Sequence, residues 1–347
     1  MIIGTAKETY RADEALLTTR PQQVWTGALI AGLAALPFFF NDYWLYLICL
    51  IAINVIAATG LNILTGFTGL VSLGQAAFMA VGAYTVAWLE RDVGSPFLLN
   101  ILLGGGVAAA IGVVVGIPSL RVKGLYLAIA TIAASFILHF IFVHWESVTG
   151  GNGGANVAPA RVFGVELITY FQLYWVIMPL TILMVLGAAN LFRTRIGRAF
   201  IAIRDRDISA EVLGIPLLRY KLMSFAVASF YAGVAGGLWA YFFRVVTPES
   251  FPFIASIFLL AAIIVGGMGT IIGGVVGALF MTLTPELLRF AVEWASPWVP
   301  NAGVLLSPVR TIVFGVLIVG FLVFEPQGLA EIIQRVRRHF RLWPFRT

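Results

Sequence analysis

The longest stretch without a charged residue runs from Tyr43 to Leu89 and contains 47 residues. At about 1.5 Å per residue, one helix of this length would far exceed the roughly 30 Å hydrocarbon core of a bilayer. The stretch therefore predicts two membrane crossings joined by a turn. We place the turn at Thr65–Gly69 (TGFTG), because glycine readily adopts turn conformations.

Other apolar runs recur along the chain, in which 60% of residues are hydrophobic and 11% are charged. A run of 33 residues, 253–285, is too long for one span, and its GGMG sequence (Gly266–Gly269) indicates either two crossings or a broken hairpin. The short alternating segments of a transmembrane barrel are absent from the sequence. We expect an all-α integral membrane protein, a polytopic bundle of about ten transmembrane helices with glycine-broken helices near its centre. The expected spans are 24–40, 43–64, 69–89, 97–117, 124–145, 171–192, 222–243, 253–267, 271–290 and 303–324.

Basic residues are distributed unevenly between the two sides that these spans define. With the amino terminus inside, the segments 1–23, 118–123, 193–221 and 325–347 carry 17 of the 22 Lys and Arg residues. This excess follows the positive-inside rule, and a count of nine spans would move the basic tail outside. We therefore expect a cytoplasmic segment at 1–23, a transmembrane domain at 24–324 and a basic cytoplasmic tail at 325–347. The net charge of +6 then reflects the cytoplasmic side of a membrane protein, not binding to nucleic acid.

The loop Arg193–Lys221 holds seven of those basic residues between two charge-free flanks. Its apolar residues recur at helical spacings until Pro216 and predict one amphipathic helix, with Phe200, Ile203, Ala210 and Leu213 on its apolar face. Two roles fit such a helix equally well. It either lies on the anionic lipid of the inner leaflet or docks on a cytoplasmic partner.

Polar side chains and glycines interrupt the apolar sequence at two places expected to lie at membrane depth. Irregular backbone is tolerated there only where it is buried in protein or lines a cavity, whereas glycines also allow close helix packing. Both roles remain open, and two such segments in one chain favour a translocation pathway. For Gly269, Gly273 and Gly277, which lie four apart, helix packing is the favoured interpretation. The candidate pathway residues are Asn62, Thr65, Gly66, Ser72, Gly74, Gln75, Gly266 and Gly267.

Catalytic and metal sites are not expected. The single cysteine, Cys49, allows neither an internal disulfide nor a cysteine cluster. The glycine-rich stretch Thr149–Pro159 lacks the Gly-Lys-Ser/Thr ending of a phosphate loop. His139 and His144 are five residues apart and fit an interfacial aromatic belt better than a metal site. We therefore do not expect an enzyme.

Arg310 near the tenth span remains ambiguous. A snorkelling interfacial arginine is favoured over a ligand for a substrate carboxylate. A secondary transporter would need ionisable residues deep in the spans, but nearly all 38 charged residues lie in the expected loops. That class is therefore the less favoured alternative.

Three stretches together resemble the permeases of bacterial branched-chain amino acid ABC transporters, of the LivM type. They are TGLNILTGFTGLVSLGQAAFMAVGAYTVA (Thr59–Ala87), RIGRAFIAIRDRDISAEVLGIPLLRYKLMSFAVASFYAGVAGGL (Arg195–Leu238) and EPQGL (Glu325–Leu329). The resemblance extends from about Ala57 to Leu329. It implies a permease subunit in the bacterial inner (plasma) membrane, with both termini cytoplasmic.

The resemblance also implies partners. They are a second, homologous permease subunit, two cytoplasmic ATP-binding subunits that use ATP and Mg, and a periplasmic or lipid-anchored substrate-binding protein. This chain itself would hold no cofactor. The loop Arg193–Lys221 resembles the coupling helix that fits a groove on the ATPase, although Ile208, Ser209, Ala210 and Gly214 only partly match the importers' Glu-Ala-Ala and Gly pattern. The implied coupling residues are Gly197, Arg198, Arg204, Asp207, Ala210, Glu211 and Gly214.

The implied substrates are leucine, isoleucine and valine, that is, hydrophobic amino acids. Similar permeases are associated with urea, short amides and aromatic acids, and these stay open as alternatives. The sequence TGFTGLVSLGQAAF (Thr65–Phe78) is more similar to the amino-acid branch. In such systems the binding protein sets most of the specificity.

Overall fold

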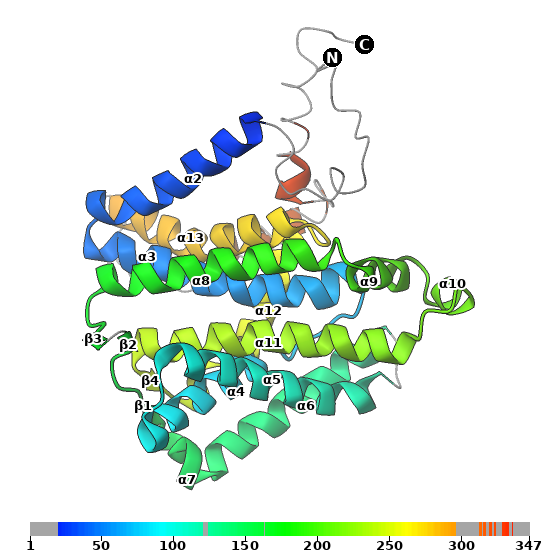
Figure 1. Ribbon diagram of the computed structural model, residues 1–347, viewed down its shortest axis with the longest axis horizontal. Coiled ribbons are helices and arrows are strands. Elements are labelled where there is room, and N and C mark those ends of the chain that lie inside the picture. Colours follow the sequence, from blue (N-terminus) through cyan, green and yellow to red (C-terminus); the bar gives the residue numbers. More distant parts are fainter. Residues whose placement is uncertain are drawn as a thin grey trace, which may run out of the picture.

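The computed structural model describes residues 20–120, 124–162 and 164–295, together with scattered residues between 312 and 335. Long helices run side by side along one direction and make up most of this part of the chain (Figure 1). Seven of the described helical segments are long and apolar enough to cross a membrane. The predicted all-α membrane architecture is confirmed at this level.

The helices match most of the expected spans, with bounds as follows. They are α2 (Arg20–Phe39), α3 (Asp42–Leu61), α4 (Gln75–Trp88), α5 (Phe97–Ser119), α6 (Leu125–His144), α7 (Glu146–Thr149), α8 (Tyr170–Leu191), α9 (Arg195–Asp205), α10 (Asp207–Val212), α11 (Leu217–Phe243), α12 (Phe253–Gly266) and α13 (Ile271–Ala295). Wide π-helical turns η1 (Asn62–Phe67) and η2 (Leu89–Val93) extend α3 and α4, and the 3-10 turns are η3 (Gly151–Gly153) and η4 (Pro248–Ser250). The run 253–285 forms two helices, α12 and the greater part of α13. The expected span 303–324 and Arg310 lie almost wholly outside the described residues.

Helix α11 lies at the centre of the bundle and is bordered by α3, α4 and α5 (Figure 1). Glycines let it approach α4 backbone to backbone. A Cβ at Gly82 would lie 2.1 Å from the Gly233 carbonyl oxygen, and one at Gly236 would lie 1.8 Å from that of Met79. Because apolar side chains gain little by leaving lipid, such small-residue contacts are the means by which membrane helices pack closely. The core is therefore built on the α4–α11 contact.

The two ends of the bundle differ (Figure 1). One end carries α7 and two short antiparallel ribbons, β1 (Ala155–Asn156) with β4 (Val245–Val246) and β2 (Arg161–Val162) with β3 (Val165–Glu166). The opposite end carries α9 and α10, which belong to the basic loop Arg193–Lys221. We call the first the outer end and the second the inner end, following the charge distribution.

Candidate functional site

The chain between α3 and α4 is not helical at 68–74, where buried and exposed residues alternate. The expectation of a helix over 69–89 is therefore wrong at its start, because α4 begins only at Gln75. Gly69 has φ of +75°, a conformation that ends a right-handed helix. The Thr68 hydroxyl donates to the carbonyl of Ile63 at 3.0 Å and fixes this reversal.

Polar side chains of this segment are buried and hydrogen-bonded to nearby backbone. The Thr65 hydroxyl donates to the Leu70 carbonyl (3.1 Å), the Gln75 amide donates to the Ala57 carbonyl (3.0 Å), and the Ser72 hydroxyl accepts from the Gly74 N–H (3.3 Å). Neighbouring helices complete the set, since Thr131 accepts from the Leu73 N–H and Ser256 from the Ala76 N–H. The unwound backbone is thus satisfied by protein, as membrane depth requires.

Asn62 joins this segment to the break between α12 and α13. Its amide nitrogen donates to the Thr270 carbonyl at 2.7 Å, and its amide oxygen accepts from the Gly269 N–H at 3.0 Å. A Cβ at Gly66 would lie 1.9 Å from that amide oxygen and 2.5 Å from the Gly269 nitrogen. Position 66 therefore has room only for glycine. We call Asn62, Gly66, Gly269 and Thr270 the junction.

Glycines also hold α12 against α13. A Cβ at Gly266 would lie 1.9 Å from the Gly273 carbonyl oxygen, and one at Gly277 would lie 1.9 Å from that of Ala262. The contacts of Gly273 and Gly277 agree with the packing interpretation. Gly269 does not share their helix face, because α13 begins only at Ile271, so the expected three-residue face was wrong there. Gly267 caps α12 with φ of +113°.

The basic loop forms two helices where the sequence predicted one. Arg206 has an extended backbone (φ −158°, ψ 109°) and separates α9 from α10. The Asp207 carboxylate accepts from the Ile208 N–H at 2.9 Å and lies 3.7 Å from the Lys221 ammonium, which favours a new helix start. Of the expected apolar face, Phe200, Ile203 and Ala210 are buried, whereas Leu213 is 79% exposed.

The remaining coupling residues surround these two helices. A Cβ at Gly197 would lie 2.4 Å from the Phe192 Cα, so α9 packs tightly on the end of α8. Arg198 donates to the Arg193 carbonyl at 3.0 Å, and Glu211 is exposed. Gly214 lies in the turn after α10, with φ of +83°.

Arg204 connects α9 to the junction. A Cβ on Gly69 would lie 3.4 Å from the Arg204 Cα, and a Cβ on Gly269 would lie 2.2 Å from an Arg204 guanidinium nitrogen. A cavity of about 470 Å³ adjoins this contact and is lined by Thr68, Gly69, Leu70, Leu120, Gly124, Lys221 and residues 203–209. Movement of α9 would therefore press directly on the backbone of both broken segments.

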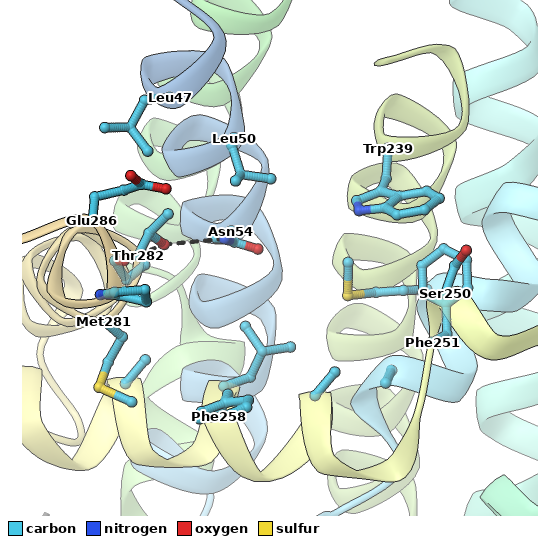
Figure 2. Close-up of a pocket in the computed structure, with 17 residues that line it drawn as sticks. Leu47, Leu50, Asn54, Trp239, Ser250, Phe251, Phe258, Met281, Thr282 and Glu286 are labelled. Atoms are coloured by element: carbon cyan, nitrogen blue, oxygen red, sulfur yellow. Dashed lines mark hydrogen bonds between the residues drawn. The ribbon is translucent and has the colours of Figure 1, made fainter. Parts of the chain in front are cut away.

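A second cavity, of about 330 Å³, lies in the outer half between α3, α4, α11, α12 and α13. Figure 2 shows its polar groups, Asn54, Ser250, Thr282 and Glu286, set among Leu50, Trp239, Phe251, Phe258 and Met281. The Asn54 amide donates to the Thr282 hydroxyl at 3.0 Å, drawn as a dashed line. We call this space the outer cavity. The predicted pathway residues do not line it.

Charged groups lie at the outer end of this cavity. The Tyr43 hydroxyl donates to the Glu286 carboxylate and accepts from the Arg289 guanidinium at 2.6 Å. Arg289 also approaches Glu286 directly, with Nε 3.2 Å from the carboxylate oxygen. Sequence reasoning missed this cluster. The sequence could have revealed it through the spacing of Thr282, Glu286 and Arg289, which places these residues near one face of a helix.

The outer histidine occupies an aromatic setting. The His144 ring stacks on Phe140 with centroids 4.0 Å apart, and its Nδ1 lies 2.9 Å from the Phe140 carbonyl oxygen. These contacts fit the expected interfacial belt.

Comparison with known proteins gives a consistent family. The model of the family described as "Branched-chain amino acid transport system / permease component" matches residues 43–322. The high-affinity branched-chain amino acid transport system permease protein LivM of Escherichia coli (strain K12) is 31% identical over 336 residues, covering 90% of this chain and 76% of that protein.

Two further relatives and one solved structure are also similar to this chain. A probable branched-chain amino acid transport permease protein LivM of Methanocaldococcus jannaschii is 23% identical, covering 79% of this chain and 89% of that protein. The autoinducer 2 import system permease protein LsrC of Salmonella paratyphi B is 26% identical, covering 75% of this chain and 78% of that protein. PsaBC from Streptococcus pneumoniae, solved with Fab, has a TM-score of 0.43 at 17% identity, covering 87% of this chain and 99% of that chain.

Proposed function

This chain belongs to the family of permease components of branched-chain amino acid transport systems, and we propose that it forms half of the membrane pathway of an ATP-driven importer for hydrophobic amino acids. It crosses the bacterial inner membrane about ten times with both termini cytoplasmic. A homologous permease forms the other half, two cytoplasmic ATPases supply the energy, and a binding protein delivers substrate. The family membership carries this proposal.

The inner end supplies a docking feature for the ATPase. Helix α10 projects beyond the ends of the long helices (Figure 1). It and the following turn expose three large apolar side chains, Ile208 (71%), Val212 (83%) and Leu213 (79%), beside the charged Asp205, Arg206 and Glu211. An exposed short helix with apolar anchors and a charged rim fits a groove on a protein partner. The lipid-surface alternative is less favoured because α10 lies at the tip of the projection.

Coupling then follows from the contacts of Arg204. A displacement of α10 and α9 by the ATPase moves Arg204 against Gly69 and Gly269. Asn62 links those two segments through its paired hydrogen bonds, so both respond together. The junction residues and the segment Asn62–Gln75 act in this view as the moving inner part of the pathway.

The substrate is the less constrained part of the proposal. By its printed name, one relative imports autoinducer 2, so related permeases serve different chemical classes. The greater similarity to a branched-chain amino acid permease favours leucine, isoleucine and valine over urea, short amides and aromatic acids.

The test is uptake of leucine by the complete importer in proteoliposomes, with ATP hydrolysis measured in parallel. We expect Arg204→Ala to lower binding-protein-stimulated ATP hydrolysis and leucine uptake about 10-fold, because loss of the side chain removes its contact with the junction. Arg195→Ala, an exposed residue at the start of α9, is the matched control and should stay within twofold of wild type. Equal activity of the two variants would contradict coupling through Arg204. Failure of the solubilised chain to retain ATPases and a second permease would reject the importer.

A further inference from the structure

The outer cavity has the size of a binding site for one small molecule. Its volume of about 330 Å³ lies at the lower end of the roughly 300–1,000 Å³ range of ligand pockets. Apolar side chains form most of its wall, including Met79, Phe251, Phe258, Leu259 and Met281. A few convergent polar groups among such walls orient a ligand instead of merely retaining it.

The charged groups at the outer end of the cavity lie in the last turn of an apolar segment. Glu286 and Arg289 belong to a segment long and apolar enough to cross a membrane, Ile271–Phe290. Ionisable residues within such segments usually pair and mark a substrate or ion path. Here the pair is partly accessible, since the Glu286 side chain is 26% exposed and that of Arg289 is 40% exposed. A ligand in the cavity therefore meets Glu286, which lines it, and Arg289 lies 3.2 Å beyond that carboxylate at the mouth.

Polar atoms deeper in the cavity retain hydrogen-bonding capacity. Asn54 donates one bond to Thr282, and its amide oxygen has no hydrogen-bond partner within the described part of the chain. Pro285 has no N–H, so the Met281 carbonyl lacks its usual helical donor. Both acceptors belong to residues that line the same cavity as Glu286. Asn54 on α3 and Met281 and Glu286 on α13 thus provide acceptors that can attract an ammonium.

We propose that the outer cavity binds a zwitterionic hydrophobic amino acid in transit, with Glu286 accepting from the α-ammonium and Arg289 pairing with the α-carboxylate. The apolar side chain then lies against Phe258 and Leu259. The two ligand charges replace the Glu286–Arg289 contact with two new ion pairs, so that no charge is left unpaired. This assignment rests on the proposed function and specifies the substrate chemistry of its pathway.

The same geometry favours a zwitterion over the alternative ligands. Urea and a short neutral amide carry no charge that would replace the contact between Glu286 and Arg289. A neutral ligand would leave Glu286 and Arg289 paired with each other and would gain no ion pair of its own. An acid without an ammonium would leave Glu286 unpaired.

The experiment uses the complete importer in proteoliposomes with radiolabelled leucine. Glu286→Gln and Arg289→Gln should each reduce uptake roughly 10- to 100-fold, since each removes a charge-assisted bond to the substrate. The matched controls are Glu166→Gln and Arg161→Gln, which neutralise an exposed ion pair of 2.7 Å at the same end of the protein and should leave uptake unchanged. Normal leucine uptake by both cavity variants would overturn the site and leave the importer intact. Absence of leucine uptake by the wild-type complex would reject both proposals.

A second measurement needs no variant and guards against misfolding. Millimolar leucine should raise the thermal unfolding midpoint of the solubilised complex without its binding protein, because a ligand that binds the folded state stabilises it. Neither 4-methylpentanoate, which lacks the ammonium, nor 3-methylbutylamine, which lacks the carboxylate, should do so at equal concentration. Equal shifts with all three compounds, or no shift with leucine, would contradict recognition of the zwitterion.

Discussion

The junction and the outer cavity lie in adjoining parts of the chain but satisfy their polar groups differently. Both involve α3 or its extension η1, and both involve α13 or the turn before it. In the junction, Asn62 is 1% exposed and both ends of its amide are hydrogen-bonded. In the cavity, Asn54 is only partly buried and donates one bond. The same residue type therefore holds two segments together at one site and leaves an open acceptor at the other.

This difference indicates that ligand binding and closure of the pathway take place at different positions along the membrane normal. Asn54 and Asn62 are eight residues apart on nearly continuous helix, which places them about 12 Å apart along its axis. The outer group faces a space that can admit a ligand, whereas the inner group bonds to Gly269 and Thr270, beside which Arg204 of α9 lies. Binding and closure are then adjacent but separate functions, and substitutions should separate them.

The largest effect is expected from bulk in the junction. Gly66→Leu places a side chain where a Cβ alone would lie 1.9 Å from the Asn62 amide oxygen. The junction must open, so we expect leucine uptake to fall at least about 100-fold, while association with the ATPases through α9 and α10 persists. Uptake in proteoliposomes and co-purification from detergent measure the two parts.

Gly106→Leu is the matched control for this substitution. A Cβ at Gly106 meets nothing within 4 Å, and the position is exposed on α5. Its uptake should equal that of wild type. Normal transport by Gly66→Leu would show that the close approach at the junction is not needed for function.

The two asparagines provide the most direct test of the comparison. Asn62→Ala removes two hydrogen bonds and leaves the Gly269 N–H and Thr270 carbonyl without partners, so a loss of about 2–4 kcal/mol in the free energy of unfolding is expected. Asn54→Ala removes one bond at a partly open site and should cost only about 1 kcal/mol. Thermal unfolding of the two purified variants measures the difference. Equal destabilisation by the two substitutions would contradict the distinction between Asn62, which holds two segments together, and Asn54, which faces the ligand cavity.

Sequence reasoning located the junction but not the cavity, for a physical reason. Asn62 and Gly66 stand out in an apolar run because polar and glycine residues disturb a membrane helix locally. Local disturbance does not reveal the partner, and Asn62 bonds to residues more than 200 positions away. The pathway role proposed for this segment remains a prediction. The structure adds that its side chains hold the backbone in place.

The outer cavity depends on contacts between distant helices. Asn54, Trp239 and Glu286 come together only when α3, α11 and α13 pack, and no local spacing links them. Helix positions were easier to predict, since length and apolarity decide them, and α5, α6 and α8 match within two residues. The expected single helix within the loop Arg193–Lys221 was wrong because periodicity does not reveal the extended backbone at Arg206.

The smallest effect is expected at the rim of the cavity. The Ser250 hydroxyl lines the outer cavity and lies 2.9 Å from that of Thr247, where either can donate. Ser250→Ala removes one neutral hydroxyl at a position that water can reach, and a neutral hydrogen bond contributes about 1 kcal/mol, so leucine uptake should fall no more than about fivefold. Ser147→Ala, exposed in α7 at the same end, is the control and should have no effect. Initial uptake rates over a range of leucine concentrations measure the change. A loss at Ser250 as large as that of Glu286→Gln would show that recognition depends on the rim hydroxyl and not on the charged pair, and would move the binding site outward toward η4.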